Sequence, residues 1–403
     1  MAVSKSAYSD AMPRSYDVVI IGGGVIGSAV AYFLAGATDF TGSVLVVEKD
    51  SAYAESATPR SAGGIRQQFS TPENILMSRF GAAFVRSAGD RLAVAGEAPH
   101  IPFHEAGYLF LATAAGMAVL AANHALQTRL GARVALLAPA ELAARFPWLN
   151  VGDLAGGSLG LADEGWIDPY ALLQAFRRKA RSLGVAYLAD EAVGLRRHGN
   201  RVAAVALART GAVDCGAVVN AAGARAADVA AFAGLALPVR PRKRFVYVFD
   251  CRTPVPGAPL VIDPSGVYFR PEGAGFIGGV SPPAEDDPDC LDLELDDRLF
   301  DDVVWPALAH RVPAFAAIKL LRAWAGHYDY NTLDQNVILG PHPAVGNFYF
   351  ANGFSGHGLQ QSPAVGRGIA ELIAYGAYRT LDLRRFSYDR VLSGAAVREL
   401  NIV

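Results

Sequence analysis

The sequence predicts a mixed α/β fold, and three of its features support that prediction. A short apolar run at residues 18–21 is followed by a glycine-rich turn and an apolar helical stretch over 28–34. Apolar runs and helical segments continue to alternate through residue 220. Residues 238–282 then form β-rich runs separated by turns. The alternation predicts a parallel sheet covered by helices, and the later runs predict a mostly antiparallel sheet with one covered face.

A G-x-G-x-x-G pattern, formed by Gly22, Gly24 and Gly27, follows the first apolar run. Between a strand and a helix this pattern is typical of a Rossmann-like dinucleotide-binding unit. The three glycines allow, in order, a tight turn, close approach to a pyrophosphate and close helix–strand packing. A second apolar run, 44–47, ends at Glu48, at the distance where an acid meets a ribose hydroxyl. The acid favours an unphosphorylated ribose, so FAD or NAD over NADP.

Two other interpretations of this stretch are weaker. Residues 18–36 carry no charge and approach the ~20 apolar residues that a membrane span requires. The clustered glycines argue against one continuous helix, and charged residues follow at 48–50. A glycine-rich turn without a ligand is the other alternative. We therefore expect a dinucleotide site and no transmembrane segment.

Composition limits the class of protein. The chain has 403 residues, a net charge of −2 and 52% hydrophobic residues, which is typical of a compact globular protein of about two domains. The sequence lacks the stripe of basic residues that would indicate a nucleic-acid partner. Three cysteines without metal-ligand or C-x-x-C spacing favour a reducing compartment and no metal site. The first 15 residues lack the apolar core of a secretory signal, so a cytoplasmic protein is expected.

The remaining elements follow from local patterns. Thr71–Pro72 suits the N-cap and first position of a helix, which we expect over 72–95, and a long amphipathic helix is expected after Asp168–Pro169. Residues 56–70 form a loop rich in small residues. Further helices are expected over 116–131 and 139–146 and from Ser362–Pro363 onward, and strands over 106–112, 185–193, 201–207, 212–220 and 348–350.

Two charged stretches stand out in the second half. Residues 240–244 contain Arg240, Arg242, Lys243 and Arg244, which are expected at a solvated sheet edge. Residues 284–302 are densely acidic and are expected as a solvated loop and helix face, with a docking patch as the alternative. Arg270 lies among aromatic residues and is the candidate for holding a substrate carboxylate.

Four blocks together resemble the D-amino-acid oxidase and sarcosine oxidase superfamily of FAD enzymes. They are IIGGGVIGSAV (20–30), AGGIRQQFS (62–70), VVNAAG (218–223) and GFSGHGLQQSPAVGRGIAEL (353–372). Within the superfamily the GIRQQFS and GFSGHGLQQSP patterns resemble a group linked to assembly of mitochondrial complex I, and its bacterial relatives. The resemblance implies two interleaved domains. An FAD-binding domain would take 1–85, 153–230 and 326–403, and a substrate-binding domain would take 86–152 and 231–325.

The resemblance also implies chemistry and site residues. The expected reaction is hydride transfer from a C–H bond next to an amine nitrogen to flavin N5, followed by imine hydrolysis. Arg66 and His327 are the candidate catalytic residues, and Tyr247, Arg270 and Gln360 the candidate substrate-binding residues. The candidate FAD-binding residues are Gly22, Gly24, Val25, Ile26, Gly27, Glu48, Lys49, Thr58, Arg60, Ser61, Ala62, Gly63, Gly64, Ile65, Val193, Ala222, Gly223, Gly326, Phe354, Gly356, His357, Gly358, Leu359 and Gln360.

Three positions depart from the pattern of monomeric sarcosine oxidases. Ile277 stands where they carry the lysine that promotes reaction with oxygen, and Gln360 replaces the lysine that binds the substrate carboxylate. His327 stands where they carry the cysteine that links the flavin. It is expected either to bond covalently to FAD or to be an unbonded residue of the pocket. The electron acceptor is therefore expected to be O2 or another redox partner.

The expected function is oxidation of a small amine or amino acid. A 2-hydroxy-acid dehydrogenase on the same fold is the first alternative. The second is an assembly factor or complex subunit with structural FAD, docking through residues 284–302. A homo-oligomer is left open.

Overall fold

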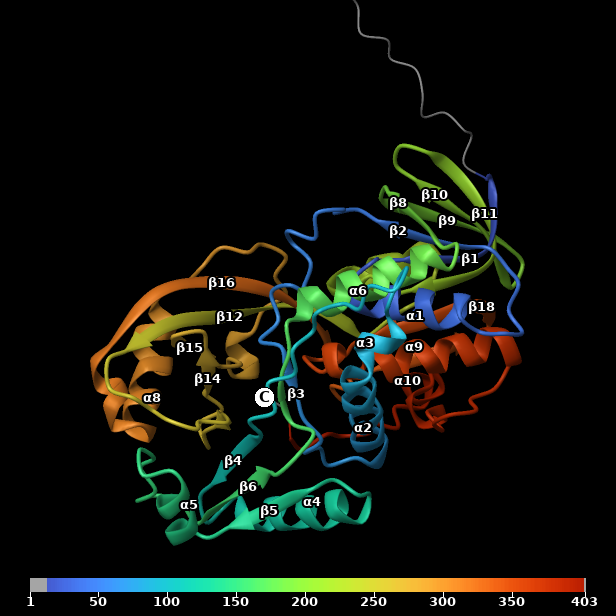
Figure 1. Cartoon of the computed structure of the whole chain (residues 1–403). Helices are drawn as coiled ribbons and strands as arrows, with labels where there is room; N and C mark the ends of the chain where they lie inside the picture. Colours follow the sequence, from blue (N-terminus) through green and yellow to red (C-terminus); the bar gives the residue numbers. More distant parts are fainter. Residues whose placement is uncertain (1–12, 402–403) are drawn as a thin grey trace, which may run out of the picture.

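The structure, a computed structural model, describes residues 13–401 and consists of two large sheets with flanking helices (Figure 1). In Figure 1 the first sheet and its helices occupy the right of the view, and the second sheet occupies the left. Expectations about residues 1–12, including the missing secretory signal, lie outside the described residues. The fold matches the predicted α/β class, with a parallel core in one sheet and a mostly antiparallel second sheet.

The first sheet has the order β17-β18-β11-β1-β2-β8, and a hairpin of β9 and β10 pairs with β11. β1 lies parallel to both β2 and β11, and β11 lies parallel to β18. The strands are β1 (Ser15–Ile21), β2 (Val44–Glu48), β8 (Ala186–Ala189), β9 (Ala192–His198), β10 (Arg201–Leu207), β11 (Gly211–Asn220), β17 (Ile338–His342) and β18 (Val345–Asn352).

Alternation along β1 places its side chains in two different cores. Val18 and Ile20 belong to the core beneath the helices, whereas Val19 and Ile21 belong to a core on the opposite face of the sheet. Successive side chains of a strand point to opposite faces, so a strand buried on both faces must be apolar throughout. This is why residues 18–21 read as an unbroken apolar run.

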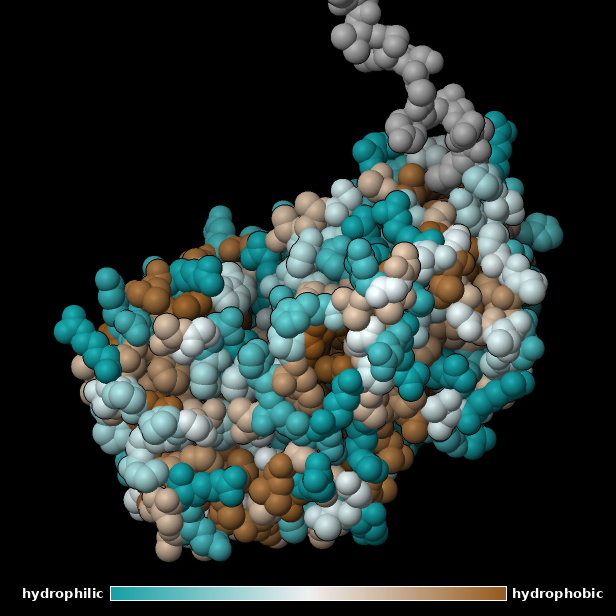
Figure 2. Space-filling model, viewed as in Figure 1, coloured by the Kyte–Doolittle hydropathy of each residue, from teal (hydrophilic) through white to brown (hydrophobic). Residues whose placement is uncertain are grey.

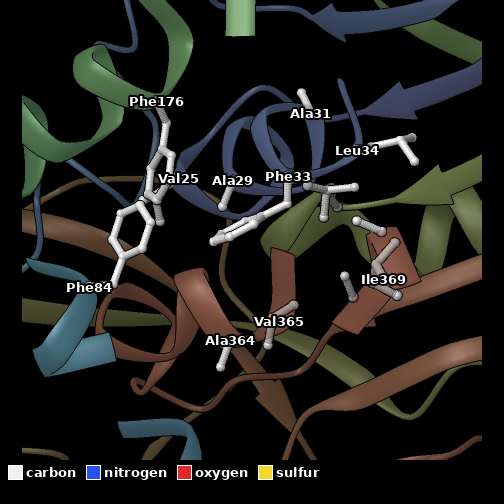
Figure 3. Close-up of a cluster of buried hydrophobic side chains, with 14 of the residues drawn as sticks. Val25, Ala29, Ala31, Phe33, Leu34, Phe84, Phe176, Ala364, Val365 and Ile369 are labelled. Carbon is white, nitrogen blue, oxygen red and sulfur yellow. The ribbon is translucent and has the colours of Figure 1, made fainter. Parts of the chain in front are cut away.

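Four helices pack on the first face: α1 (Val25–Ala35), α2 (Pro72–Arg86), α6 (Pro169–Ser182) and α9 (Gly358–Tyr375). Figure 3 shows their contact, with Phe84 and Phe176 side by side and Ala364 and Val365 of α9 facing α1. The rings of Phe84 and Phe176 are stacked at 5.2 Å. α1 and α9 approach closely because α9 carries Gly366, where a Cβ would lie 2.7 Å from the backbone of α1.

The second sheet has the order β16-β12-β15-β14-β13-β4-β6-β5. Its strands are β4 (Tyr108–Ala112), β5 (Val134–Leu137), β6 (Gly156–Gly160), β12 (Val239–Cys251), β13 (Leu260–Ile262), β14 (Tyr268–Glu272), β15 (Gly275–Gly279) and β16 (Ile318–Asn331). One face covers an aromatic core in which Phe269 and Phe276 surround Phe315 at centroid distances of 5.1 and 5.0 Å. A separate pair of short strands, β3 (Gly64–Ile65) and β7 (Gly165–Trp166), joins the loop near residue 64 to the segment that precedes α6.

The smaller helices complete the connections. They are α3 (Ala88–Arg91), α4 (Met117–Arg129), α5 (Pro139–Arg145), α7 (Ala226–Phe232), α8 (Trp305–Arg311) and α10 (Asp389–Ser393), with short turns η1 (Gly223–Arg225), η2 (Ala284–Asp286), η3 (Phe300–Val304), η4 (Pro313–Ala317) and η5 (Arg384–Phe386).

The predicted start of the last long helix is wrong. α9 begins at Gly358, so Pro363 lies inside the helix rather than at its first position. The Ser362 hydroxyl donates to the Leu359 carbonyl at 2.8 Å and so takes the place of the N–H that proline lacks. Two other elements are shorter than expected: the helix over 72–95 ends at Arg86, and the strand over 185–193 is divided between β8 and β9.

Each sheet gathers segments that are distant in sequence. β1, β11 and β18 of the first sheet come from three separate parts of the chain, as the proposed interleaved division requires. β6 pairs in the second sheet, although 153–160 fall in the proposed FAD-binding domain. We therefore propose the same division with β6 assigned to the substrate-binding domain.

On the face shown in Figure 2, hydrophilic residues cover most of the surface and hydrophobic residues lie in small separate groups. Within residues 13–401, no helix combines the length and the apolar character needed to cross a bilayer.

Candidate functional site

A cavity of about 730 Å³ runs from the first glycine-rich turn to the strands of the second sheet. At one end its walls include Gly22, Gly24 and Glu48, and at the other end Tyr108, Tyr268 and Leu260. Most of the candidate FAD-binding residues line it. They are Gly22, Gly24, Val25, Ile26, Glu48, Lys49, Thr58, Arg60, Ser61, Ala62, Gly64, Ala222, Gly223, Gly326, Phe354, Gly356, His357, Gly358, Leu359 and Gln360.

The first turn has the geometry that its glycines predict. Gly22 has φ +100°, and a Cβ there would lie 2.3 Å from the Ala221 carbonyl oxygen. A Cβ on Gly27 would lie 1.9 Å from the Gly22 carbonyl oxygen, so this glycine serves close packing and does not line the cavity. A Cβ on Gly24 would meet no atom closer than the Thr58 hydroxyl at 3.4 Å. The space beside Gly24 is therefore left for a ligand.

Glu48 ends β2 with its carboxylate folded against the same turn. One carboxylate oxygen accepts the Gly23 N–H at 2.7 Å and the other accepts the Asp50 N–H at 2.8 Å. Burial raises the pKa of this carboxyl. The side chain thus lies beside the backbone that would hold a pyrophosphate, where an adjoining ribose would be reached.

The loop over residues 56–64 is held against β16 of the second sheet. Arg60 donates to the Ala325 carbonyl at 2.6 Å, and the Trp324 indole donates to the Arg60 carbonyl at 2.9 Å. Gly63 has φ +81°, and a Cβ there would lie 2.3 Å from the Ile167 carbonyl. Gly63 and the fully buried Ile65 therefore shape the loop without lining the cavity.

The turn before α9 is fixed by β16. The Asp329 carboxylate accepts the N–H groups of Gly353 at 2.8 Å and of Phe354 at 3.1 Å, and the Tyr328 hydroxyl donates to the Ser355 carbonyl. Burial raises the pKa of Asp329 to about 6. This turn places Gly356 and the first residues of α9 on the cavity wall.

Arg66 is buried at the centre of the site. Its guanidinium donates to the backbone carbonyls of Gln68 and Asn401, each at 2.6 Å, and lies over the Phe69 ring at 4.0 Å. A third contact of 3.2 Å joins it to His357 Nε2. A guanidinium has five N–H donors and these contacts use three, so two donors have no partner among residues 13–401 and could meet a ligand. Burial lowers its pKa, and it remains cationic at neutral pH.

His357 is a neutral partner of that cation. Its pKa is held well below the usual value by burial and then by the charge of Arg66. Arginine can only donate, so Nε2 must accept and the ring proton lies on Nδ1. The ring also meets Phe69 edge to face at 4.9 Å. His357 therefore cannot serve as a strong base at neutral pH.

Two tyrosines of the far wall were not predicted from the sequence. Tyr108 on β4 and Tyr268 on β14 line the cavity with Leu260 and Ile262 of β13. Within residues 13–401 neither hydroxyl has a hydrogen-bond partner, and Tyr108 is only 6% exposed. Burial raises the pKa of Tyr268 to about 12 and that of Tyr108 further, so both hydroxyls stay protonated as donors. Tyr268 precedes the predicted Arg270 by two residues in the GVYFRP motif. The motif therefore did indicate the cavity wall, but its tyrosine and not its arginine lines the cavity.

Three further candidate residues, besides Gly27, Gly63 and Ile65, lie outside the cavity wall, which corrects their expected positions. Tyr247 points into the core of the second sheet, since side chains alternate along β12 and its neighbour Val246 takes the cavity side. Arg270 donates to the Ala62 carbonyl at 2.8 and 2.9 Å and pairs with Glu272, so it supports the loop. Val193 is 49% exposed, while the preceding Ala192 lines the cavity.

The remaining departures from the family pattern have clear positions. His327 lines the cavity, with Nδ1 3.3 Å from the Glu55 carbonyl oxygen and Nε2 3.0 Å from that of Leu291. Gln360 also lines it, and its amide oxygen accepts the Arg66 backbone N–H at 2.7 Å. Ile277 is 1% exposed in a small cluster with Val246 and Val248. The catalytic and binding roles assigned to His327 and Gln360 stay predictions.

Glu164, behind the site, leads to a prediction about pH. Its carboxylate accepts the Gln67 N–H at 2.6 Å and the Gln68 amide at 2.8 Å, yet burial dominates and raises its pKa to about 7. A raised folded pKa stabilises the protein below about pH 4.5, and this contribution is lost as the pH rises through 7. We expect the free energy of unfolding to fall by roughly 1–3 kcal/mol over that interval.

Urea unfolding at several pH values measures this slope. In Glu164→Gln the free energy of unfolding should depend less steeply on pH, whatever the effect of the substitution at any single pH. Asp329 contributes to the pH dependence that remains. The control is Glu97→Gln, because the Glu97 side chain is 80% exposed. An unchanged slope in Glu164→Gln would contradict the assignment.

The cavity residues fit FAD. The strand–turn–helix unit offers a glycine-walled space next to a carboxylate, and the 56–64 loop and the α9 turn line the same cavity beyond it. A dinucleotide with an isoalloxazine at the Arg66 end would be held by Gly24 and Glu48 at one end and by backbone groups around Gly64 and Gly356 at the other.

Comparison with known proteins agrees with this fit. A family model described as FAD dependent oxidoreductase matches residues 17–372. The chain is 46% identical to FAD-dependent oxidoreductase domain-containing protein 1 of Xenopus laevis, over 98% of this chain and 86% of that protein. It is 25% identical to mitochondrial sarcosine dehydrogenase of Mus musculus, over 94% of this chain and 42% of that protein. A solved structure of L-proline dehydrogenase from P. horikoshii is similar with a TM-score of 0.84 and 28% identity, covering 95% of this chain and 99% of that one. The match extends over most of the sequence and confirms the resemblance: the chain belongs to the DAO family of FAD-dependent oxidoreductases, with FAD as its cofactor.

Proposed function

We propose that the protein oxidises the C–N bond of a small amino acid or secondary amine that carries a carboxylate. The observation that carries the proposal is the donor set around one end of the cavity. Two donors of Arg66 without a partner in residues 13–401 and the hydroxyls of Tyr108 and Tyr268 lie on the cavity wall, together with the apolar Leu260 and Ile262. Such a set complements an anion, because every group in it donates and one is charged. Sarcosine and proline, the substrates in the names of two similar proteins, have this chemistry.

The same groups favour an amine over a 2-hydroxy acid. Oxidation of a hydroxyl requires a base that takes its proton, whereas an amine needs only to be neutral. His357 is a weak base, and its Nε2 already accepts from Arg66. The positive charge of Arg66 disfavours a nearby ammonium group and so favours the neutral amine. FAD, when bound, supplies the hydride acceptor for the C–H bond next to the nitrogen.

The residues of this chain bind and orient the substrate. Arg66 and the two tyrosines would hold its carboxylate, and Leu260 and Ile262 would cover its apolar part and exclude water. Tyr268 and Tyr108 retain their protons throughout, because their pKa values are raised by burial. Catalysis would thus depend on positioning in a dry pocket.

The function is tested by an anaerobic screen for loss of the flavin's visible absorbance. Candidates are sarcosine, other N-substituted glycines, proline analogues, D- and L-amino acids and 2-hydroxy acids, and each active acid is compared with its amide. We expect bleaching by an amine carboxylate and little by its amide. Faster bleaching by a 2-hydroxy acid would support the hydroxy-acid alternative, and bleaching by none would support a structural role for FAD. Admission of air afterwards separates an oxidase from a dehydrogenase.

Tyr108→Phe and Tyr268→Phe test the donor set. Each variant loses one hydrogen bond to a charged group, worth about 1.5–3 kcal/mol, so KM for the acid should rise about tenfold or more while kcat changes less. Tyr388→Phe is the matched control, since its hydroxyl donates to the Ala236 carbonyl away from the cavity. If both variants keep the wild-type KM, the tyrosines do not bind the carboxylate.

A further inference from the structure

The acidic stretch is not a free solvated face. We define its central part, residues 285–298, as the strap. Between η2 at its start and the helical residue Arg298 at its end, the strap contains no helix or strand. It lies alongside β12 and β16, where it forms an amber loop in Figure 1. Except for Asp287, its residues are exposed or half-buried. It is therefore held by few apolar contacts.

Ion pairs with β12 hold the strap instead. Asp287 accepts two hydrogen bonds from Arg244, at 2.7 and 2.8 Å, and Asp292 pairs with Lys243 at 2.6 Å. Asp289 pairs with Arg242 and lies 3.7 Å from Arg240. The basic residues expected at a solvated edge and the acids expected in a free loop thus neutralise each other. This pairing neutralises three acids of the strap, whereas Glu285, Asp286, Glu294 and Asp297 have no ion pair within residues 13–401.

The strap also forms part of the cavity wall. Leu291 lines the cavity beside Arg244, His327 and Tyr328, and its carbonyl oxygen lies 3.0 Å from His327 Nε2. The Arg244 guanidinium lies over the Tyr328 ring at 4.5 Å. Displacement of the strap would therefore open the cavity at this side and free the Arg244 guanidinium.

The ends of the strap are better anchored than its middle. Pro282 and Pro283 precede it, and Tyr247 donates to the Asp296 carbonyl at 3.2 Å just before the buried Phe300. Between these points one backbone–backbone hydrogen bond joins the strap to β12, from the Cys290 N–H to the Pro241 carbonyl at 2.9 Å. Lys243 of β12 also donates to the Glu294 carbonyl at 2.9 Å. A segment with fixed ends and a weakly held middle can move as a unit.

We propose that the strap is a salt-sensitive lid over the cavity, latched by the Arg244–Asp287 pair. This goes beyond the proposed function and does not depend on which substrate is oxidised. The exposed pairs contribute little each and are screened by salt, whereas the half-buried two-bond pair is the strongest single attachment. In the open state Arg244 would present a cationic entrance that attracts anionic ligands.

Hydrogen–deuterium exchange of residues 285–298 in the FAD-loaded protein tests the lid. In the wild type, exchange should become faster when NaCl is raised from about 0.05 M to about 0.5 M, because the Debye length falls severalfold over this range. Asp287→Asn should accelerate exchange at low salt at least about tenfold, because it removes the charge of the latch. The control is Asp297→Asn in the same segment, since within residues 13–401 no ion pair involves the Asp297 side chain.

A second measurement tests whether the lid controls access. Iodide should quench flavin fluorescence more strongly in Asp287→Asn than in the wild type. In the wild type, quenching should also increase at high salt, once the effect of ionic strength on the quenching of free FAD has been subtracted. Hydrogen–deuterium exchange that does not depend on salt and is equal in Asp287→Asn and Asp297→Asn would contradict the proposed lid. Faster exchange with unchanged quenching would overturn its control of access. If Asp287→Asn does not fold, the salt series on the wild type decides both points.

Discussion

Replacing Arg66 with lysine is expected to lower kcat/KM for the amine carboxylate by about 100-fold or more. The guanidinium holds the carbonyls of Gln68 and Asn401 and contacts His357, while two further donors remain for the substrate. A lysine ammonium has three donors on a flexible stem, so it cannot keep these contacts and also bind a carboxylate. Anaerobic reduction kinetics of the purified variant measure the loss.

Two comparisons separate this effect from misfolding. Arg66→Lys should retain FAD and should lose discrimination between the acid and its amide, because the charge–carboxylate contact is what distinguishes them. Arg178→Lys is the control, since this arginine is 43% exposed at a surface pair with Glu97. A kcat/KM within threefold of wild type would contradict the role of Arg66.

Replacing Gly27 with alanine is expected to remove most of the bound FAD. The added Cβ would lie 1.9 Å from the Gly22 carbonyl oxygen, which belongs to the turn that receives the cofactor. A backbone atom cannot move aside as a side chain can, so α1 must shift, at a cost of about 1–3 kcal/mol or more. Each 1.4 kcal/mol lost from binding weakens FAD about tenfold.

The flavin-to-protein ratio and the thermal unfolding temperature of the purified variant check this prediction. Gly346→Ala is the matched control, because a Cβ at Gly346 in β18 would meet nothing within 4 Å. The control should keep both values. Full FAD occupancy in Gly27→Ala would mean that the close contact of strand and helix is not required.

Elements whose signals are local were predicted well. The apolar runs of β1 and β2, the glycines between them and the start of α6 after Asp168 each depend on a few neighbouring residues. Thr71 does stand at the N-cap of α2, but its side chain makes no capping hydrogen bond. The start of α9 was misplaced for a specific reason. Ser362–Pro363 is a good capping pair in isolation, but the Ser362 hydroxyl satisfies the Leu359 carbonyl and lets the helix include the proline.

The polar groups around the substrate end depended on contacts between distant segments. The pleat of β12 decided that Val246 and not Tyr247 would reach the cavity. Arg270 does not face the substrate end because its guanidinium donates hydrogen bonds to the Ala62 carbonyl, more than 200 residues away in sequence.

By itself, then, the sequence determined the α/β class, the dinucleotide-binding unit and the FAD family, because a strand, a turn and a helix of one short segment carry that chemistry. Only the tertiary structure decided which donors face the substrate and which acids are free. Tyr108, Tyr268, Arg66 and His357 meet from four separate segments, and three acids of the strap pair with a strand more than 40 residues earlier. The partner of a charged or polar side chain is set by the three-dimensional arrangement of backbone and side chains, which no local pattern records.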